Sequence, residues 1–310
     1  MQDPLKVFSG TANPNLATAI CKALGIPLGQ SHTSKFSNEN IFVQIGENVR
    51  ERDCFVVQPL QTSADIMELL IMLDALRYAS AKRITAVIPY YSYARSDKKD
   101  MPRISITARL IADLLVTAGA NRILTMTLHS PQVQGFFSVP CDHLSPTPLF
   151  CQYFQQMDLS NAMVLAPDAG SAKRAGVYSS RLNLPLGFVD KRRVSDLHVE
   201  ARSVVGDVTG KKVIIFDDEI ASAGSLVETV KSIQAFGATE VYAGATHGVL
   251  SGPAIERITQ AAIEQVVVTD TLDVPATKRI DKVRVLSVAP LFAEAIKRIH
   301  TGESVSMMFE

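Results

Sequence analysis

Residues 213–245 read VIIFDDEIASAGSLVETVKSIQAFGATEVYAGA. An apolar, β-branched run at 213–216 predicts a buried strand, and the pattern at 225–237 predicts a helix. A second apolar run begins at Glu240. Two short strands joined by a helix are typical of a parallel β-α-β unit. The stretch therefore indicates an α/β fold.

The same alternation continues over nearly the whole chain, so we predict parallel sheets covered by helices. In the first half we expect strands at 6–9, 41–45, 54–58, 84–89 and 122–128, and helices at 65–80 and 105–118, the second closed by Gly119. In the second half we expect strands at 163–166, 186–189, 213–216, 240–245, 265–269 and 283–288, and helices at 172–182, 225–237, 253–262 and 291–300.

The chain has 310 residues, which indicates two domains because a domain usually has roughly 100 to 200. The segment PCDHLSPTP at 140–148 contains three prolines, and proline interrupts regular elements. We therefore expect a domain boundary or crossover at this segment.

The composition is that of a globular protein, with 47% hydrophobic and 20% charged residues. Lys plus Arg and Asp plus Glu both total 31, so the formal net charge is zero. No overall field favours nucleic acid or an anionic membrane as a partner, and any anion site must be local. The four cysteines lack CxxC spacing, which favours reduced thiols over a disulfide framework or structural zinc.

The N-terminal sequence MQDPLKVFSG has no basic stretch followed by a long apolar run, so we expect no secretory signal. No apolar segment approaches the roughly 18 residues that indicate a membrane span. The sequence predicts a soluble cytoplasmic protein that binds neither nucleic acid nor membrane.

The turn after the strand at 213–216 has the residues of a phosphate site. Asp217 and Asp218 end the strand, and Ser222 and Ser225 stand on either side of a small-residue pair before the helix. The start of a helix offers free N–H groups and the positive end of its dipole, which suit a phosphate. The carboxylates suit ribose hydroxyls or water on a divalent cation. The alternative is an acidic β-α turn with a serine cap.

A second cluster, YYSYARSDKKD at 90–100 with Arg103 beyond it, follows the predicted strand at 84–89. Ligands in open α/β sheets bind beyond the carboxyl ends of the strands, so this basic, aromatic loop is well placed for a polyphosphate. A solvated charge run is the alternative. His129 and Asp168 also end predicted strands. A lone histidine is more often structural, but its place at a strand end favours a functional role.

A third cluster places three consecutive cations, Lys191, Arg192 and Arg193, after the strand at 186–189. The following residues, VSDLHVEARSV, have little periodicity, so we expect an irregular loop that can act as a lid. Guanidinium and ammonium groups stabilise transition-state charge on phosphoryl oxygens without moving a proton. The alternative is a basic loop without a role.

Taken together, these stretches resemble the ribose-phosphate pyrophosphokinases, which make phosphoribosyl pyrophosphate, in their phosphate-regulated class I. The similarity covers nearly the whole chain and rests on FSNENIFVQIGENVR, VIPYYSYARSDKKD, PRISITARLIADLL, TLHSPQVQGFF, PDAGSAKRA, VDKRR, the phosphate turn, THGVLSGPAIERI and ESVSMMF. Phosphoribosyltransferases share the acidic phosphate turn, but the ARSDKKD and DKRR stretches favour the synthase.

The resemblance implies two similar domains of the type I phosphoribosyltransferase fold, each a mostly parallel sheet flanked by helices. It implies an N-terminal domain at 1–145 joined by the C-terminal tail, about 290–310, and a C-terminal domain at 146–289 that carries the sugar-phosphate loop. It also implies the activity: the C1 hydroxyl of ribose 5-phosphate attacks the β-phosphorus of ATP, takes its β,γ-pyrophosphoryl group and releases AMP. The product serves nucleotide, histidine, tryptophan and NAD biosynthesis.

The resemblance assigns roles to individual residues. It implies catalytic roles for Lys191 and Arg193, and ATP contacts from Phe36, Asn38, Asn40, Arg95, Ser96, Asp97 and His129. It implies ribose 5-phosphate contacts from Asp217, Asp218, Ala221, Ser222, Ala223, Gly224 and Ser225. It places magnesium at His129 and Asp168, and regulation at Arg50, Ser304, Ser306 and Phe309.

The sequence departs from the usual family pattern at several of these positions. Ala221 stands where a third carboxylate is common, and serines at 222 and 225 stand where threonines are common. Asn40 replaces a frequent glutamate and Ser96 a frequent glutamine. In the regulatory set, Asn48 replaces a common serine.

The implied partners are ATP, ribose 5-phosphate, phosphate as activator and ADP as inhibitor at a subunit interface. The implied assembly is a hexamer built from dimers, in which Asn38 and Asn40 contribute to the ATP site from a neighbouring subunit. Without the resemblance, ESVSMMF would be interpreted as a frayed tail. A catalytically silent regulatory paralogue and a phosphoribosyltransferase are the alternative functions.

Overall fold

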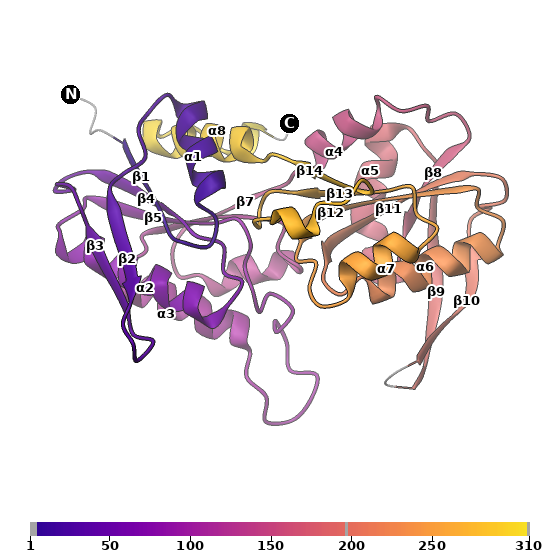
Figure 1. Cartoon of the computed structure of the whole chain (residues 1–310), viewed down its shortest axis with the longest axis horizontal. Coiled ribbons are helices and arrows are strands. Elements are labelled where there is room, and N and C mark those ends of the chain that lie inside the picture. Colours follow the sequence, from indigo (N-terminus) through magenta and orange to yellow (C-terminus); the bar gives the residue numbers. More distant parts are fainter. Residues whose placement is uncertain (1–4, 196–197, 309–310) are drawn as a thin grey trace. The chain divides into compact units, whose positions relative to one another are not determined.

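The structure is a computed structural model that describes residues 5–195 and 198–308. For residues 191–202 only the backbone is described. The chain divides into two compact units. The first comprises the described residues up to Ser145, Thr271–Asp273 and those from Ser287 onward, and the second comprises Pro146–Asp270 and Val274–Leu286. Figure 1 shows the helices and strands of both units.

The first unit contains a five-stranded parallel sheet with strand order β1-β4-β5-β6-β7. Its strands are β1 (Leu5–Ser9), β4 (Asp53–Val57), β5 (Arg83–Ile88), β6 (Arg122–Met126) and β7 (Cys141–Leu144). Every residue of β4 is buried, because helices cover both faces of the sheet. This explains why the strand has a continuous apolar run rather than an alternating pattern.

Four α-helices cover this sheet: α1 (Pro14–Leu24), α2 (Ser63–Tyr78), α3 (Thr107–Ala118) and α8 (Ala289–Thr301). Figure 1 shows α1 and α8 on one face and α2 and α3 on the other. The short 3-10 helices η1 (Pro131–Phe136) and η4 (Ser306–Met308) also belong to this unit. Thr62 begins α2 with a capping box, in which its hydroxyl accepts from the Asp65 N–H and the Asp65 carboxylate accepts from the Thr62 N–H.

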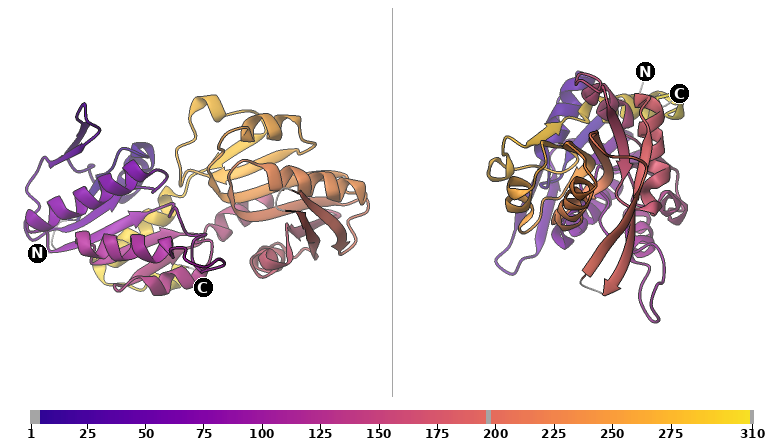
Figure 2. Two further views of the ribbon diagram at one scale, coloured as in Figure 1. Left: turned by 90° about the horizontal axis from the view of Figure 1, so that it is seen from below. Right: turned by 90° about the vertical axis from the view of Figure 1, so that its right-hand side faces the viewer.

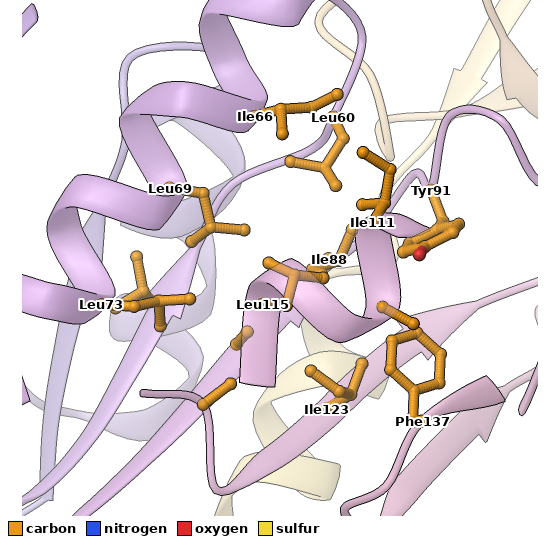
Figure 3. Packing of buried hydrophobic residues seen from close by; sticks show 14 of the residues in the cluster. Leu60, Ile66, Leu69, Leu73, Ile88, Tyr91, Ile111, Leu115, Ile123 and Phe137 are labelled. Atoms are coloured by element: carbon orange, nitrogen blue, oxygen red, sulfur yellow. The ribbon is translucent and has the colours of Figure 1, made fainter. Parts of the chain in front are cut away.

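The core of the first unit lies between α2, α3 and the sheet. Figure 3 shows leucine and isoleucine side chains of α2 and α3 packed against Ile88 and Ile123 of the strands. The Tyr91 ring packs edge-on against Phe137, with centroids 5.6 Å apart. Tyr91 thereby anchors the loop that follows β5.

A two-stranded antiparallel hairpin, β2 (Ser31–Lys35) and β3 (Ile41–Ile45), packs against α2. Lys35 pairs with Ile41, so residues 36–40 form the turn. The sequence SHTSK carries no apolar alternation, which is why β2 was not predicted.

The second unit contains a seven-stranded sheet with strand order β10-β9-β8-β11-β12-β13-β14. Its strands are β8 (Ala162–Ala166), β9 (Leu186–Ser195), β10 (His198–Val205), β11 (Lys212–Ile220), β12 (Glu240–Gly248), β13 (Gln265–Thr269) and β14 (Val283–Leu286). The β9–β10 pair is antiparallel and the other pairs are parallel. Figure 2 shows β9 and β10 continuing as a hairpin beyond the sheet.

The helices of the second unit are α4 (Thr147–Phe154), α5 (Ala172–Leu182), α6 (Gly224–Ala235) and α7 (Ala254–Gln260), with short 3-10 helices η2 (Ala169–Ser171) and η3 (Ala276–Lys278). Phe216 of β11 is central to the core beneath α4 and α5. Its ring stacks on Tyr178 with centroids 3.7 Å apart and contacts Phe150 and Phe154 edge-on. These contacts fix the strand immediately before Asp217.

The predicted α/β class is confirmed, and most predicted elements lie within a few residues of those observed. Elements missed were α1, β2, β7, α4 and β10. The prediction of an irregular loop after Val189 is wrong, because the chain continues in β9 to Ser195 and pairs with β10. In the described part of the chain, no helix is long and apolar enough to cross a membrane.

Candidate active site

The acidic turn lies at the carboxyl end of β11, between β8 and β12. Asp217 and Asp218 are the sixth and seventh residues of this strand, with side chains 34% and 3% exposed. The chain then turns through Ser222, which is exposed, and enters α6 at Gly224. The turn therefore presents a partly exposed carboxylate next to the start of a 12-residue helix.

The backbone of the turn is held from one side by the loop that follows β12. The Leu250 N–H donates to the Ile220 carbonyl at 3.0 Å, and the Ser251 N–H donates to the Ala221 carbonyl at 2.9 Å. Ala223 adopts a left-handed conformation with φ 58°, which turns the chain into the helix. Such a conformation strains a residue with a Cβ, and its persistence at a turn is common at ligand sites.

Arg174 of α5 forms ion pairs with both carboxylates. Its Nη1 lies 3.0 Å from Asp218 Oδ1, and its Nη2 lies 3.5 Å from Asp217 Oδ1. Burial, then a hydrogen bond to the Asp218 side chain and the negative charge of Asp218, raise the pKa of Asp217, and Arg174 opposes this shift. Arg174 thus favours the ionised form of the carboxyl, which accepts hydrogen bonds.

Sequence reasoning did not identify Arg174 as a site residue. The available signal was the motif PDAGSAKRA, in which Arg174 stands on the helix after a strand predicted to end in Asp168. The contact requires β8 and β11 to be neighbours, as they are in the structure. A single sequence does not give strand order.

Asp168 follows β8 and lies at the same edge of the sheet as Asp217, because β8 and β11 are parallel neighbours. Its side chain is exposed. Oδ1 accepts from the Ser171 N–H at 2.8 Å and from the Ser171 hydroxyl at 3.0 Å. These bonds cap η2 and orient the carboxylate at the strand end.

Lys191 and Arg193 lie in β9, the other neighbour of β8. The backbone of Lys191 pairs with Ala201 and that of Arg193 with Val199 of β10. The structure therefore places both residues on a strand of the hairpin rather than in an irregular loop.

Arg95, Ser96 and Asp97 lie in the first unit, in the loop between β5 and α3. Arg95 is exposed. The Ser96 hydroxyl accepts from the Thr107 N–H at 3.2 Å, and its carbonyl accepts from the Ala108 N–H at 3.2 Å. Ser96 is therefore bound to the start of α3.

His129 follows β6, the strand next to β5, so it lies at the same sheet edge as the Arg95 loop. Phe36, Asn38 and Asn40 lie in the exposed turn of the β2–β3 hairpin. The Phe36 ring is 57% exposed and contacts Phe42 edge-on at 6.2 Å. An exposed aromatic pair of this kind offers a stacking surface to a base.

Three of the expected regulatory residues, Arg50, Ser304 and Ser306, are exposed in the first unit. The Arg50 N–H donates to Asn48 Oδ1 at 3.0 Å, and the Ser304 carbonyl accepts from Arg298 Nη1 at 3.0 Å. Phe309 lies outside the described residues.

The structure brings the predicted residues together in two groups. Asp168, the turn at 217–225 and the β9 cations lie on adjacent strands of the second unit. The Arg95 loop and His129 lie at adjacent strands of the first unit. The two expected magnesium residues, His129 and Asp168, thus belong to different units. Among the described residues, no group of three or more His, Cys, Asp or Glu side chains is arranged to hold a metal ion.

Comparison with known proteins identifies the family. A family model described as the N-terminal domain of ribose phosphate pyrophosphokinase matches residues 5–119, and a phosphoribosyl synthetase-associated domain matches residues 197–310. A ribose-phosphate pyrophosphokinase of Deinococcus radiodurans is 57% identical over 99% of this chain and 98% of its own length. One from Caldanaerobacter subterraneus is 50% identical over 98% of both chains.

A solved structure leads to the same conclusion. The crystal structure of phosphoribosylpyrophosphate synthetase from Mycobacterium smegmatis is 40% identical and aligns with a TM-score of 0.92. The alignment covers 97% of this chain and 100% of the Mycobacterium chain. With this similarity over its full length, the chain belongs to the ribose-phosphate pyrophosphokinase family of enzymes.

Proposed function

We propose that this protein is an active ribose-phosphate diphosphokinase that transfers the β,γ-pyrophosphoryl group of ATP to the C1 hydroxyl of ribose 5-phosphate. The products are 5-phosphoribosyl 1-pyrophosphate and AMP. The observation that carries the proposal is the acidic turn, where Arg174 holds Asp217 and Asp218 beside the start of α6. The family membership supports the same activity.

In this proposal the second unit binds ribose 5-phosphate. The N–H groups at the start of α6 and the hydroxyls of Ser222 and Ser225 bind the 5-phosphate. The ionised Asp217 and Asp218 accept hydrogen bonds from the ribose hydroxyls and so orient the sugar. Ala221 provides no carboxylate, so the acidic contacts of the turn come from residues before it.

The first unit binds ATP. Arg95 and Asp97 contact the phosphates and their associated cation, while His129 stands at the neighbouring strand end. Phe36, Asn38 and Asn40 contact the adenine of an ATP molecule that is bound to a neighbouring subunit. Ser96 acts through the loop conformation, because its hydroxyl and carbonyl are bound to α3.

Magnesium fits the residues present when it arrives with the nucleotide. Mg²⁺ is usually held by one or two carboxylates together with substrate phosphates and water. Asp168 is an exposed carboxylate oriented by Ser171 at a strand end, which matches that mode. Bound magnesium would neutralise charge on the ATP phosphates, and Asp168 is the carboxylate of the second unit that would hold it.

The reaction forms a bond from the C1 oxygen to the β-phosphorus and breaks the bond from that phosphorus to the oxygen it shares with the α-phosphate. AMP departs with that oxygen, and the hydroxyl proton is released. Positioning and charge neutralisation supply most of the rate in such transfers. Lys191 and Arg193 supply positive charge to the phosphoryl oxygens in the transition state.

We further infer phosphate activation and ADP inhibition at a subunit interface that includes Arg50, Ser304, Ser306 and Phe309, in a hexamer built from dimers. A cytoplasmic location agrees with the four free cysteines, because thiols stay reduced there.

The test is an assay of the purified chain with ATP, magnesium and ribose 5-phosphate in which AMP and ADP are separated. Release of AMP in equal amount to phosphoribosyl pyrophosphate supports the proposal, and ADP as product would contradict it. An Asp217→Asn, Asp218→Asn double variant serves as the inactive control. No release of AMP by the wild-type chain would favour a silent paralogue, and pyrophosphate release from phosphoribosyl pyrophosphate and a nucleobase would favour a phosphoribosyltransferase.

A further inference from the structure

Arg257 places a guanidinium group against the turn that joins β11 to α6. It lies in α7, and its Nη1 donates a hydrogen bond to the Ser222 carbonyl at 2.9 Å. A Cβ built on Gly224 would lie 3.2 Å from the same Nη1. The guanidinium therefore contacts the turn at both the serine and the glycine.

The charge of Arg257 has no counter-ion among the described residues. Its guanidinium makes the single hydrogen bond to Ser222 and no ion pair with a carboxylate in that part of the chain. The side chain is exposed. By contrast, the guanidinium of Arg174 at the other end of the turn is paired with two aspartates. Arg257 thus leaves an unneutralised cation next to the start of α6.

The turn itself provides hydrogen-bond donors but no cation. Residues 220–226, IASAGSL, are all uncharged. The ester phosphate of a sugar carries about −1.5 to −2 charges at neutral pH, as a phosphorylated side chain does. Arginine presents several N–H donors in a planar fork that matches phosphate oxygens. With one Nη1 hydrogen on Ser222, the remaining donors of Arg257 are available for an anion in the turn.

We propose that Arg257 is a binding residue for the 5-phosphate of ribose 5-phosphate, donating to a phosphate oxygen while its Nη1 holds the Ser222 carbonyl. The inference rests on the proposed function of the turn. It gives a chemical role to Arg257 in the THGVLSGPAIERI segment, which otherwise contributes only backbone support to the turn.

The test compares a ligand that has the phosphate with one that lacks it. Binding of ribose 5-phosphate and of ribose to the full chain is measured by calorimetry without ATP, and KM for ribose 5-phosphate is measured with ATP. Arg257→Ala should weaken ribose 5-phosphate binding by about 10- to 100-fold, the effect of one hydrogen bond to a charged group. Ribose binding should not change, and kcat should change little.

Two further variants separate charge from support of the turn. Arg257→Lys keeps the charge without the fork and should restore part of the affinity. Arg257→Gln keeps an N–H donor for Ser222 without the charge and should behave like Arg257→Ala. Lys231→Ala removes an exposed cation further along α6 and should leave both affinities unchanged.

Unchanged ribose 5-phosphate affinity in Arg257→Ala would overturn the proposal. So would an equal loss for ribose and ribose 5-phosphate, or full affinity in Arg257→Gln, because each indicates a purely structural role. If the wild-type chain binds ribose 5-phosphate but releases no AMP, the proposed activity fails and the binding measurements still decide the role of Arg257.

Discussion

Arg174 Nη1 lies 3.0 Å from Asp218 Oδ1, and this ion pair joins α5 to the carboxyl end of β11. The Asp218 side chain is almost fully buried, whereas that of Arg174 is partly exposed. Arg174 also reaches Asp217, so one guanidinium balances two adjacent carboxylates. The acidic turn therefore depends on a residue from a neighbouring element for both its charge and its geometry.

Replacing Arg174 with Met should lower the free energy of unfolding by about 2 to 3 kcal/mol at neutral pH, because it leaves a buried carboxylate without its partner. The partial exposure of Arg174 keeps the loss below that of a fully buried pair. Urea unfolding of wild type, Arg174→Met and Arg174→Lys measures this loss of unfolding free energy, and we expect a smaller loss for Arg174→Lys than for Arg174→Met. Equal stability of wild type and Arg174→Met would show that the pair contributes nothing.

Stability should depend on pH through Asp217, whose pKa is raised from 3.8 to about 7, first by burial and then by the hydrogen bond to Asp218 and the charge of Asp218. A carboxyl with a raised pKa binds more protons in the folded state, so its contribution to stability falls as pH rises from about 4 to 7. Asp217→Asn removes this titration. The unfolding free energy of the variant relative to wild type should therefore increase over that window. A difference that is constant with pH would refute the assignment.

Lys191→Ala should reduce kcat by about 100-fold or more, the scale of removing one preorganised charged donor, with a much smaller effect on substrate KM values. Steady-state kinetics with both substrates varied measures the two effects. Lys231→Ala provides a control for the loss of one positive charge. Unchanged turnover in Lys191→Ala would exclude this residue from the mechanism.

Added phosphate should change the initial rate of the wild-type enzyme. Arg50→Ala should abolish this response and leave the rate without added phosphate largely intact. Initial rates over a range of phosphate concentrations, with and without ADP, check this expectation. A wild-type rate that does not respond to phosphate would count against the regulatory role of Arg50.

Gly244→Ala should destabilise the second unit, because the new Cβ would lie 2.9 Å from Cδ1 and Cε1 of Phe216. Overpacking of this kind typically costs about 1 to 3 kcal/mol, and displacement of Phe216 should also raise the KM for ribose 5-phosphate. Gly135→Ala is the matched control, since its Cβ meets no atom within 4 Å. Thermal unfolding of both variants and wild type measures the effect. Equal melting temperatures for Gly244→Ala and Gly135→Ala would contradict the packing argument.

The elements predicted from the sequence have strong apolar signals, and among the missed ones β2 and β10 lack such a signal. The strand β13 was predicted with its observed bounds, Gln265–Thr269. By contrast, β11 was predicted to end at Phe216, whereas the polar residues that follow pair with β12 up to Ile220. Here backbone pairing with a neighbouring strand extends the element beyond its apolar run. The same pairing accounts for β10, which has no clear periodicity of its own.

Site prediction had a similar limit. The acidic turn is a local pattern, so its residues could be named from one stretch of sequence. Arg174 and Arg257 contact it from α5 and α7, and their proximity follows from strand order and helix packing. For the same reason, the bonds from Ser96 to α3 could not be foreseen, because they join residues 11 and 12 positions apart across a loop.

The bonds of Ser96 have a consequence for how this enzyme tolerates substitution. Ile106, which precedes α3, offers no capping side chain, so the helix takes its first acceptor from a residue eleven positions upstream. A substitution at Ser96 would remove the hydrogen bond that joins the loop to the start of α3. Arg95, the preceding residue of the same loop, would lose that support as well. Replacing Ser96 with glutamine would require the longer amide to reach the Thr107 N–H, and would require a new loop path if the amide does not reach it.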